Sequence, residues 1–274
     1  MNIFFFGSTS FAAHVLIKNL KKKYKVYSFS RSDSKNNYFF DLNKINNEIF
    51  KKIKIKKIDY LFFFSSFVPH KENISEWKNC KKTNVIGLVD LLMKIKIPVK
   101  KIILASSCSV YGEQNKKNSE KNFLKPNNGY AITKFAQEKI LDIYCKQNKI
   151  KFLCYRLGYV FGKNMNNKRL VKRIILKIKN NIKIKIYNEN LNLNLIHQND
   201  ISNLISCTFK RAEGIYNITH PYRTSLRYFC NTALGKTNKK NTKNNYSPEK
   251  IFRNFPLINK PNMKKNIINF LNEN

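Results

Sequence analysis

The stretch Ile3-Phe-Phe-Phe-Gly7-Ser-Thr-Ser10-Phe11-Ala-Ala13 decides the fold. Its opening apolar run is typical of a short buried strand. Gly7 permits a tight turn, and helical spacing of apolar residues follows from Phe11 to Leu20. In dinucleotide-binding loops this order of strand, glycine turn and helix directs the free N–H groups of the helix at a pyrophosphate. Ser10 and Ala13 stand where such loops have glycine, so an ordinary strand–turn–helix unit fits the stretch equally well.

Strands and helices alternate along most of the remaining chain. Apolar runs predict strands over 25–29, 38–40, 58–64, 101–105, 152–157, 183–186 and 215–218, and helical spacing predicts helices over 11–20, 76–96, 130–146, 170–179 and 201–210. This alternation predicts an α/β fold with a doubly wound parallel (Rossmann) sheet. We expect residues 1–165 to form a dinucleotide-binding domain, to which the segment 194–210 returns. Residues 166–274 then form mainly a small, shortened substrate lobe and a C-terminal tail.

The composition is unusual in its charge. The chain has 274 residues and a formal net charge of +37, which favours an interaction with nucleic acid. Its lysines, however, are scattered and alternate with Ile, Asn and Phe, and arginine, the better ligand for phosphates and bases, is scarce. Such a composition is what an AT-rich genome produces, so we expect no specific nucleic-acid partner. The positive field would still attract an anionic substrate such as a nucleotide diphosphate.

Cysteine usage and hydropathy bear on the compartment. The six cysteines form no Cys-x-x-Cys pair, and we expect free thiols in a reducing compartment and no metal site. No apolar run approaches the roughly 20 residues that a membrane span needs, and the first residues lack the basic region of a signal peptide. A cytoplasmic protein without a membrane partner is therefore expected. The Lys/Asn/Thr-rich segment Asn238–Asn245 is expected to be mobile.

The end of the second predicted strand bears on the choice of cofactor. A carboxylate at this position would bind the adenosine ribose of NAD, whereas the chain has Ser30-Arg31. A hydroxyl and a guanidinium suit a 2′-phosphate, so NADP is favoured over NAD, unless Arg31 is only a solvated residue at a strand end. Asp41-Leu42, after the third strand, lies where it can meet the adenine edge. A helix N-cap is the alternative role for Asp41.

Tyr130-Ala-Ile-Thr-Lys134 places a phenol and an ammonium group four residues apart, on one face of a predicted helix. There the charge of Lys134 favours the phenolate, so we expect the pKa of Tyr130 to lie below its usual value of about 10. Ser107 follows a predicted strand and can complete a proton-transfer set for oxidising an alcohol or reducing a ketone. Tyrosine and lysine are both abundant, so the spacing alone has little specificity.

Taken in order, these segments resemble the extended short-chain dehydrogenase/reductase family, in particular its NAD-dependent epimerase/dehydratase group that acts on nucleotide sugars. The resemblance runs over roughly residues 2–218. The stretches that carry it are Gly7–Ala13, Asp41-Leu42, Asp59-Tyr-Leu-Phe-Phe-Phe-Ser65-Ser66, Thr83-Asn84-Val85, Ser106-Ser-Cys-Ser-Val-Tyr-Gly112, Tyr130–Lys134, Arg156-Leu-Gly-Tyr-Val-Phe-Gly162, Ile196-His-Gln-Asn-Asp200 and Gly214-Ile-Tyr-Asn-Ile218.

The resemblance implies roles for individual residues. Tyr130 would be the general acid and base, Lys134 would hold the nicotinamide ribose, and Ser107 would hydrogen-bond the reacting oxygen. Asn84 would lie near the cofactor and steady the ends of the active-site strands. The cofactor would be bound by Gly7, Ser10, Phe11, Ser30, Arg31, Asp41, Leu42, Ser65, Ser66 and Asn84 together with Tyr130 and Lys134. The alternative for the first four is a purely structural role. Tyr130 would then be a half-buried helix residue, Lys134 a surface residue, Ser107 a loop residue and Asn84 a residue on the surface of a helix. Asp200 is expected to cap the helix over 201–210.

The chain departs from the family pattern at two places. In the nucleotide-sugar 4,6-dehydratases an Asp-Glu pair occupies the positions of Cys108-Ser109 and carries out the elimination. Neither side chain is a carboxylate here, so dehydration is not expected. Tyr159 stands where many relatives have asparagine, which leaves the substrate contacts open.

The sequence therefore predicts an NAD(P)-dependent oxidoreductase of a nucleotide-linked sugar, either a 4-epimerase or a 4-ketoreductase. The family resemblance also implies a homodimer that pairs through the helices carrying Asn84 and Tyr130. The alternative from another functional class is a non-catalytic RNA-binding or scaffold protein with the same fold. The charge of +37 favours that alternative, and the retained Ser/Tyr/Lys set counts against it.

Overall fold

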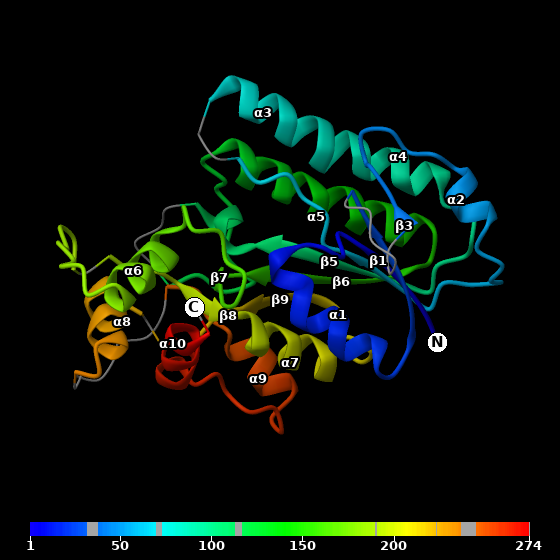
Figure 1. The fold of residues 1–274 in the computed structure, drawn as a ribbon. Helices are drawn as coiled ribbons and strands as arrows, with labels where there is room; N and C mark the ends of the chain where they lie inside the picture. The colour runs from blue at the N-terminus through cyan, green and yellow to red at the C-terminus, as the bar shows by residue number, and fades with distance from the viewer. Residues whose placement is uncertain are drawn as a thin grey trace.

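A seven-stranded parallel sheet forms the centre of the computed structural model, which describes residues 1–31, 38–69, 73–112, 117–189, 191–222, 224–236 and 245–273. The strand order is β3-β2-β1-β4-β5-β6-β9 (Figure 1). The strands are β1 (Asn2–Phe6), β2 (Lys25–Ser30), β3 (Tyr38–Phe39), β4 (Tyr60–Phe63), β5 (Lys101–Ser107), β6 (Lys151–Leu157) and β9 (Gly214–Ile218). The predicted doubly wound parallel sheet is confirmed. Strand order reverses between β1 and β4, and ligands of such sheets bind at the carboxyl ends beside this point.

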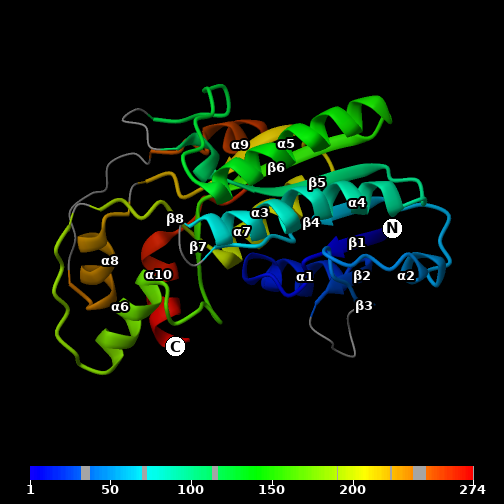
Figure 2. The same ribbon diagram turned by 90° about the horizontal axis from the view of Figure 1, so that it is seen from above.

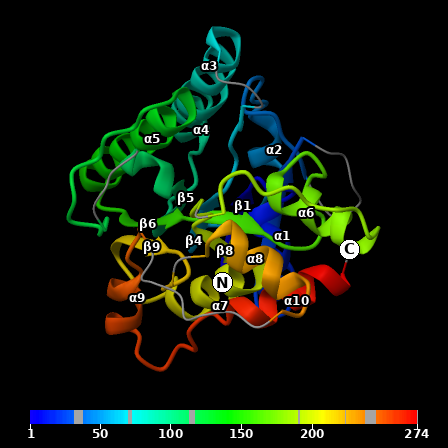
Figure 3. The ribbon, with the colours of Figure 1, turned by 90° about the vertical axis from the view of Figure 1, so that its left-hand side faces the viewer.

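Helices cover both faces of the sheet (Figures 1 and 3). One face carries the long helical segment of α3 (Ile74–Cys80), η2 (Lys81–Ile86) and α4 (Gly87–Lys94), together with α5 (Gly129–Gln147). The other carries η1 (Phe11–Ala13), α1 (His14–Lys21), α7 (Gln198–Thr208) and α9 (Glu249–Asn254). The short helices α2 (Glu48–Lys51) and η3 (Cys108–Tyr111) belong to connections between strands. Among the described residues, no helix has the length and hydropathy needed to cross a membrane.

The core explains why apolar runs form the inner strands. Side chains alternate across β1, so that Ile3 and Phe5 join the apolar cluster under α1 and α7, while Phe4 and Phe6 join the cluster under α4. All four are fully buried. Because both faces of a parallel sheet are covered by helices, its inner strands need apolar side chains at consecutive positions rather than at alternate ones.

The helix predicted over 76–96 contains a π-helical turn. It comprises α3 (Ile74–Cys80), the π-helical segment η2 (Lys81–Ile86) and α4 (Gly87–Lys94). The side chain of Asn73 caps its start by accepting a hydrogen bond from the Glu76 N–H at 2.9 Å. Inserted π-turns are frequent at functional sites. This one carries Thr83 and Asn84, both buried.

A smaller lobe stands beside the carboxyl ends of the strands (Figure 2). It contains a two-stranded parallel sheet of β7 (Tyr159–Phe161) and β8 (Leu195–His197), and the helices α6 (Leu170–Lys179), α8 (Leu226–Ala233) and α10 (Met263–Asn272). The strand predicted over 183–186 is wrong, since these residues have no regular structure; Ile184 and Ile186 pack against the apolar cluster of the lobe instead. Of the segment Asn238–Asn245, residues 238–244 lie outside the described residues.

Candidate active site

A cavity of about 880 Å³ lies between the carboxyl ends of the parallel strands and the lobe. This volume is within the usual range for small-molecule sites. The structure brings almost all predicted site residues to its wall, and these are Gly7, Ser10, Phe11, Ser30, Arg31, Asp41, Leu42, Ser65, Ser66, Ser107, Tyr130 and Lys134. Asn84 is the exception. Lining residues without a role predicted from the sequence include Thr9, Thr83 and Arg169. Tyr159, noted as a departure that bears on substrate contacts, also lines the cavity.

The turn after β1 has the shape that a dinucleotide requires. Gly7 has φ of +84°, and a Cβ atom there would lie 2.5 Å from the backbone nitrogen of Ser65. The turn is therefore pressed against the end of β4, and only glycine fits. Helix η1 begins directly after Ser10, whose side chain makes no capping hydrogen bond, so the first N–H groups of the helix lack a side-chain cap. Free helix N–H groups beside a cavity suit a pyrophosphate.

The ends of β2 and β3, at the edge of the sheet, form the part of the cavity wall that is proposed to face the adenosine end of the cofactor. Ser30 is buried and Arg31 is exposed, and both line the cavity. The carboxylate of Asp41 accepts a hydrogen bond from the Asn43 N–H at 2.9 Å and stabilises a turn, so the alternative role of Asp41 as a helix N-cap is wrong. Leu42 packs beneath Gly87, whose missing Cβ leaves room for it.

Tyr130 lies in the first turn of α5, which Asn128 caps by accepting a hydrogen bond from the Ala131 N–H at 2.9 Å. Burial raises the pKa of Tyr130 to about 12, although hydrogen bonding with Ser66, the charge of Arg169 and hydrogen bonding with Ser107 oppose this rise. The expectation of a lowered pKa is therefore wrong, because desolvation outweighs the favourable partners. A phenol that stays protonated at neutral pH is suited to donate a proton.

Lys134 follows Tyr130 by about one helical turn and is only 2% exposed. Its ammonium group donates to the carbonyl oxygen of Ala105 at 2.8 Å and to Oε1 of Gln137 at 3.0 Å. It lies over the Tyr130 ring, 5.9 Å from the ring centre. Burial lowers the pKa of Lys134 to about 8, so that the side chain is mainly cationic at neutral pH.

Ser107 is held as a hydrogen-bond donor. Its Oγ accepts hydrogen bonds from the backbone N–H of Ser109 at 3.1 Å and from the Ser109 hydroxyl at 2.9 Å. A hydroxyl has two acceptor lone pairs and one hydrogen, so these contacts leave Ser107 its hydrogen to donate. In the sequence, Ser109 stands out only as a hydroxyl residue at a position that is acidic in the 4,6-dehydratases. Its proximity to Ser107 on the turn after β5 was the available signal for a supporting role.

Asn84 supports the cavity from behind. It is fully buried and does not line the cavity, so it is not placed to contact a cofactor directly. Its Oδ1 accepts hydrogen bonds from the Phe67 N–H at 2.7 Å and from the Ser66 hydroxyl at 3.2 Å, and its Nδ2 donates to Oγ1 of Thr133 at 3.0 Å. It thereby ties the end of β4 to α5, beside Tyr130.

The lobe side of the cavity carries a cation that sequence analysis did not identify. Arg169 precedes α6, and its guanidinium lies 5.9 Å from the centre of the Tyr159 ring. The positive charge of Arg169 opposes the rise that burial causes in the pKa of Tyr130. No periodic pattern precedes α6, so nothing in the sequence indicated that Arg169 would reach the cavity.

The structure also settles the roles of Asp200, which was expected to cap a helix, and of Cys108, which replaces an acid of the 4,6-dehydratases. Asp200 does not cap α7; His197 does, by accepting a hydrogen bond from the Asn199 N–H, while Asp200 accepts one from Asn266 of α10. Cys108 is buried, its thiol donates to the carbonyl oxygen of Arg156 at 3.3 Å, and burial raises its pKa above the usual value. Cys108 is therefore an uncharged thiol with no acid function.

Comparison with known proteins gives a consistent picture. A family model described as the NAD dependent epimerase/dehydratase family matches residues 3–219. The dTDP-D-glucose 4,6-dehydratase of Dictyostelium discoideum is 24% identical over 204 residues, which cover 68% of this chain and 47% of that protein. The dTDP-4-dehydro-6-deoxyglucose reductase of Escherichia coli is 26% identical over 231 residues, 82% of this chain and 71% of that protein. The chain spans about half the length of the first curated relatives that it matches.

Solved structures share the fold over the whole chain. The UDP-glucose 4-epimerase of Thermotoga maritima, crystallised with UDP-glucose, has a TM-score of 0.83 at 17% identity, covering 100% of this chain and 98% of that one. The dTDP-glucose 4,6-dehydratase of Bacillus anthracis, crystallised with NAD, has a TM-score of 0.78 at 21% identity, covering 100% and 96%. At these identities the likeness shows the fold.

Proposed function

The chain belongs to the NAD dependent epimerase/dehydratase family, and from this premise we propose that it is an NAD(P)-dependent oxidoreductase acting on a nucleotide-linked sugar, as a 4-ketoreductase or a 4-epimerase. The observation that carries the proposal is that Ser107, Tyr130 and Lys134 line one cavity at the carboxyl ends of the sheet. The phenol of Tyr130 can protonate a carbonyl oxygen as it becomes an alcohol.

The residues present fit a nicotinamide dinucleotide. The Gly7 turn and the start of η1 would hold the pyrophosphate, Ser30, Arg31 and Asp41 the adenosine end, and Lys134 the nicotinamide ribose. When bound, the cofactor would supply the hydride donor or acceptor. The protein supplies alignment and proton transfer. Ser107 donates a hydrogen bond to the reacting oxygen, Tyr130 donates or accepts its proton, and the Arg169 cation favours the ionised phenol.

Elimination of water is not supported. A 4,6-dehydration requires an acid and a base beside the sugar, and the positions concerned hold the buried thiol of Cys108 and the hydroxyl of Ser109. Ketone reduction and epimerisation need only the Tyr130, Lys134 and Ser107 set. Arg31 favours NADP and hence the reductase, while the family pattern favours the epimerase.

The ligand carried by the purified protein tests the proposal. Mass spectrometry after denaturation should find a nicotinamide dinucleotide, or the ligand-free protein should oxidise NADPH when given a keto-sugar nucleotide. Retained NAD together with interconversion of UDP-glucose and UDP-galactose supports the epimerase, and consumption of NADPH supports the reductase. Salt-dependent RNA binding with neither dinucleotide binding nor turnover would support the scaffold alternative instead.

Arg31→Met is expected to weaken NADP binding about tenfold and to change NAD binding less than about twofold. The reason is that an exposed guanidinium at the cavity wall can pair with a 2′-phosphate that NAD lacks. Titration by isothermal calorimetry measures both affinities. Arg173→Met, which removes an exposed arginine of α6 outside the cavity lining, is the matched control. Equal losses for NAD and NADP would mean that Arg31 does not select the cofactor.

We further propose a homodimer that pairs through α3, α4 and α5. These helices lie side by side on one face (Figure 3) and expose apolar side chains. The clearest are Ile74 at 82% exposure, Met93 at 65% and Ile143 at 56%. Burial of these exposed apolar side chains against a second copy would remove them from water.

The double substitution Met93→Glu/Ile143→Glu is expected to convert the dimer to a monomer, because charges would be buried at the contact. Sedimentation equilibrium measures the mass. Leu257→Glu, at an isolated position that is 97% exposed, should leave the mass of the dimer unchanged. A wild-type protein of monomer mass would contradict the pairing.

We infer a cytoplasmic location from the cysteines, none of which forms a disulfide. Recovery of the protein from a membrane or secreted fraction would contradict this inference.

A further inference from the structure

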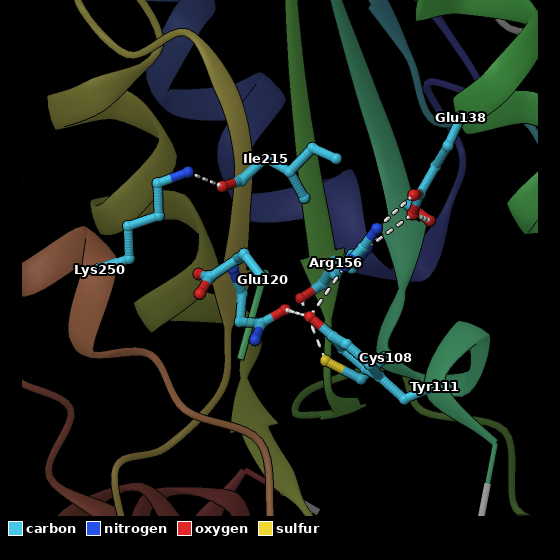
Figure 4. Close-up of polar contacts among 9 residues, drawn as sticks. Cys108, Tyr111, Glu120, Glu138, Arg156, Ile215 and Lys250 are labelled. Carbon is cyan, nitrogen blue, oxygen red and sulfur yellow. Dashed lines mark hydrogen bonds and ion pairs between the residues drawn. The ribbon is translucent and has the colours of Figure 1, made fainter. Parts of the chain in front are cut away.

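A buried chain of polar side chains runs beneath the cavity (Figure 4). Glu138 of α5 and Arg156 of β6 form an ion pair with two hydrogen bonds, Nε to Oε1 at 3.0 Å and NH2 to Oε2 at 2.7 Å. NH1 of Arg156 donates to the hydroxyl of Tyr111 at 2.9 Å, and that hydroxyl donates to Oδ1 of Asn217 in β9 at 2.8 Å. All four residues are at most 3% exposed.

The same carboxylate is bonded to the strand that carries Ser107. Ser106 donates its hydroxyl hydrogen to Oε1 of Glu138 at 2.5 Å. On either side of Ser106, the carbonyl of Ala105 accepts from Lys134, and the hydroxyl of Ser107 interacts with Tyr130. Three consecutive residues of β5 are therefore each tied to α5. The ion pair fixes the rotation of α5 about its axis, because Glu138 lies about two turns after Tyr130.

Stability alone does not account for this pair. Removing two charges from water is costly, and apolar side chains of similar volume often serve a fold equally well or better. The pair is tolerated because both carboxylate oxygens of Glu138 accept hydrogen bonds and each of the three guanidinium nitrogens of Arg156 donates one. Although burial lowers it, hydrogen bonding and the charge of Glu138 raise the pKa of Arg156 above its usual value. An ion pair that is hydrogen-bonded at every nitrogen and at both oxygens can hold two elements in one relative orientation.

Glu138 also places negative charge beside Lys134, about one helical turn away. Burial lowers the pKa of Lys134, and Cys154 and Glu138 oppose that effect. The pKa of the Cys154 thiol is itself raised well above its usual value by burial, so the thiol carries no charge at neutral pH. The carboxylate of Glu138 is then the group, among the described residues that act on Lys134, that keeps the ammonium charged.

We propose that Glu138 and Arg156 are positioning residues for catalysis, which set α5 against β5 so that Tyr130 faces Ser107, and that the carboxylate of Glu138 supplies the negative charge that balances Lys134. Neither residue lines the cavity. The inference rests on the proposed function for the meaning of that geometry. The arrangement itself belongs to the protein without ligand.

The test compares Glu138→Gln with Glu138→Asp and with Tyr155→Phe. Tyr155 precedes Arg156 on β6, and its hydroxyl forms an equally buried hydrogen bond with Thr208 at 2.6 Å. Tyr155→Phe removes this bond, which lies on the face of the sheet opposite to α5. The rate of labelling of Lys134 by an amine-reactive reagent is followed against pH by peptide mass spectrometry, in the protein without cofactor. Glu138→Gln should move the Lys134 titration to lower pH by about one unit, since a charge that favours the ammonium is removed. Glu138→Asp should move it less, and Tyr155→Phe should leave it unchanged.

Turnover gives the second measurement. Glu138→Gln should lower kcat by about 10- to 100-fold with little change in KM, because misplacement of reacting groups by about 1 Å has effects of that size. The alkaline limb of the rate profile should move with the Lys134 titration. Tyr155→Phe should reduce thermal stability without moving that limb. An unmoved Lys134 titration in Glu138→Gln, or an equal movement in Tyr155→Phe, would overturn the proposal.

Loss of one charged partner can prevent folding, so a paired substitution completes the design. Glu138→Leu/Arg156→Met replaces both charges by apolar side chains of similar size, which restores folding in other buried pairs. We expect a folded protein, by circular dichroism, with the Lys134 titration lowered and kcat still reduced. A folded double variant with wild-type titration and kcat would show that the pair is only structural. If the wild type itself has no turnover, the proposed function fails while the shift in titration remains measurable.

Discussion

Tyr130→Phe should lower turnover by about a thousandfold, the usual contribution of a positioned proton donor, and should leave dinucleotide affinity within about twofold. The substitution removes one oxygen atom and retains the ring under the Lys134 ammonium. Because the phenol has a raised pKa of about 12, it is the protonated acid that is lost. Neither Ser66 nor Ser107 can replace it, since a serine hydroxyl is a far weaker acid.

Steady-state kinetics with the nucleotide sugar, and a cofactor titration by fluorescence, measure the two quantities. Tyr144→Phe is the matched control, since Tyr144 lies near the far end of α5 and does not line the cavity. It should retain wild-type kcat. A Tyr130→Phe variant with more than about a tenth of wild-type kcat would remove the phenol from the mechanism.

Gly7→Ala should destabilise the protein by more than about 2 kcal/mol and weaken dinucleotide binding at least about a hundredfold. The new methyl group would meet backbone atoms, the nitrogen of Ser65 at 2.5 Å and the carbonyl carbon of Phe64 at 2.6 Å, which cannot rotate away. The turn must therefore move off the end of β4. Its N–H groups would move with it, and these are the groups proposed to bind the pyrophosphate.

Gly214→Ala separates this clash from backbone strain. Gly214 has φ of +85°, almost the same as the +84° of Gly7, but a Cβ atom there meets nothing within 4 Å. Both variants carry the same cost of a left-handed alanine, about 1 kcal/mol. Thermal denaturation without ligand measures stability, and calorimetric titration measures affinity. If the two variants behaved alike, close packing of the Gly7 turn against β4 would have no role in binding.

The fold was predictable where local patterns coincide with tertiary needs. The run from Ile3 to Phe6 had to become an inner strand, because only a sheet covered on both faces buries every residue of such a run. The alternation of Ile and Lys over 183–186 looked the same as an edge strand. Within the described part of the chain no strand pairs with these residues, and Ile184 and Ile186 pack onto the apolar cluster of the lobe instead. The lobe helices α8 and α10 were missed although their buried residues recur at helical spacing, so this signal was present in the sequence and was not used.

The site was predictable as a set of residues and less so as chemistry. Strand ends meet at one edge of a parallel sheet, so Gly7, Ser65 and Ser107 were bound to lie near one another once the strands were assigned. The direction of the shift in the Tyr130 pKa was not predictable from the sequence. It depends on desolvation, and desolvation depends on how the lobe and the neighbouring loops cover the phenol. Asn84 shows a second limit: the π-helical turn that sends it behind the cavity arises from packing, not from a residue pattern.

The chain passes back and forth between the sheet and the lobe. It leaves the sheet after β6 for β7, returns from β8 to α7 and β9, and leaves again for α8 before α9 packs on β9 and α10 joins the lobe (Figures 1 and 2). The sheet and the lobe, which form the two walls of the cavity, are therefore connected by several chain crossings and not by a single hinge. A rigid-body closure of the lobe onto the sheet would have to bend all these crossings at once. Neither part is one continuous segment, so neither can be removed without also removing a strand or a helix of the other.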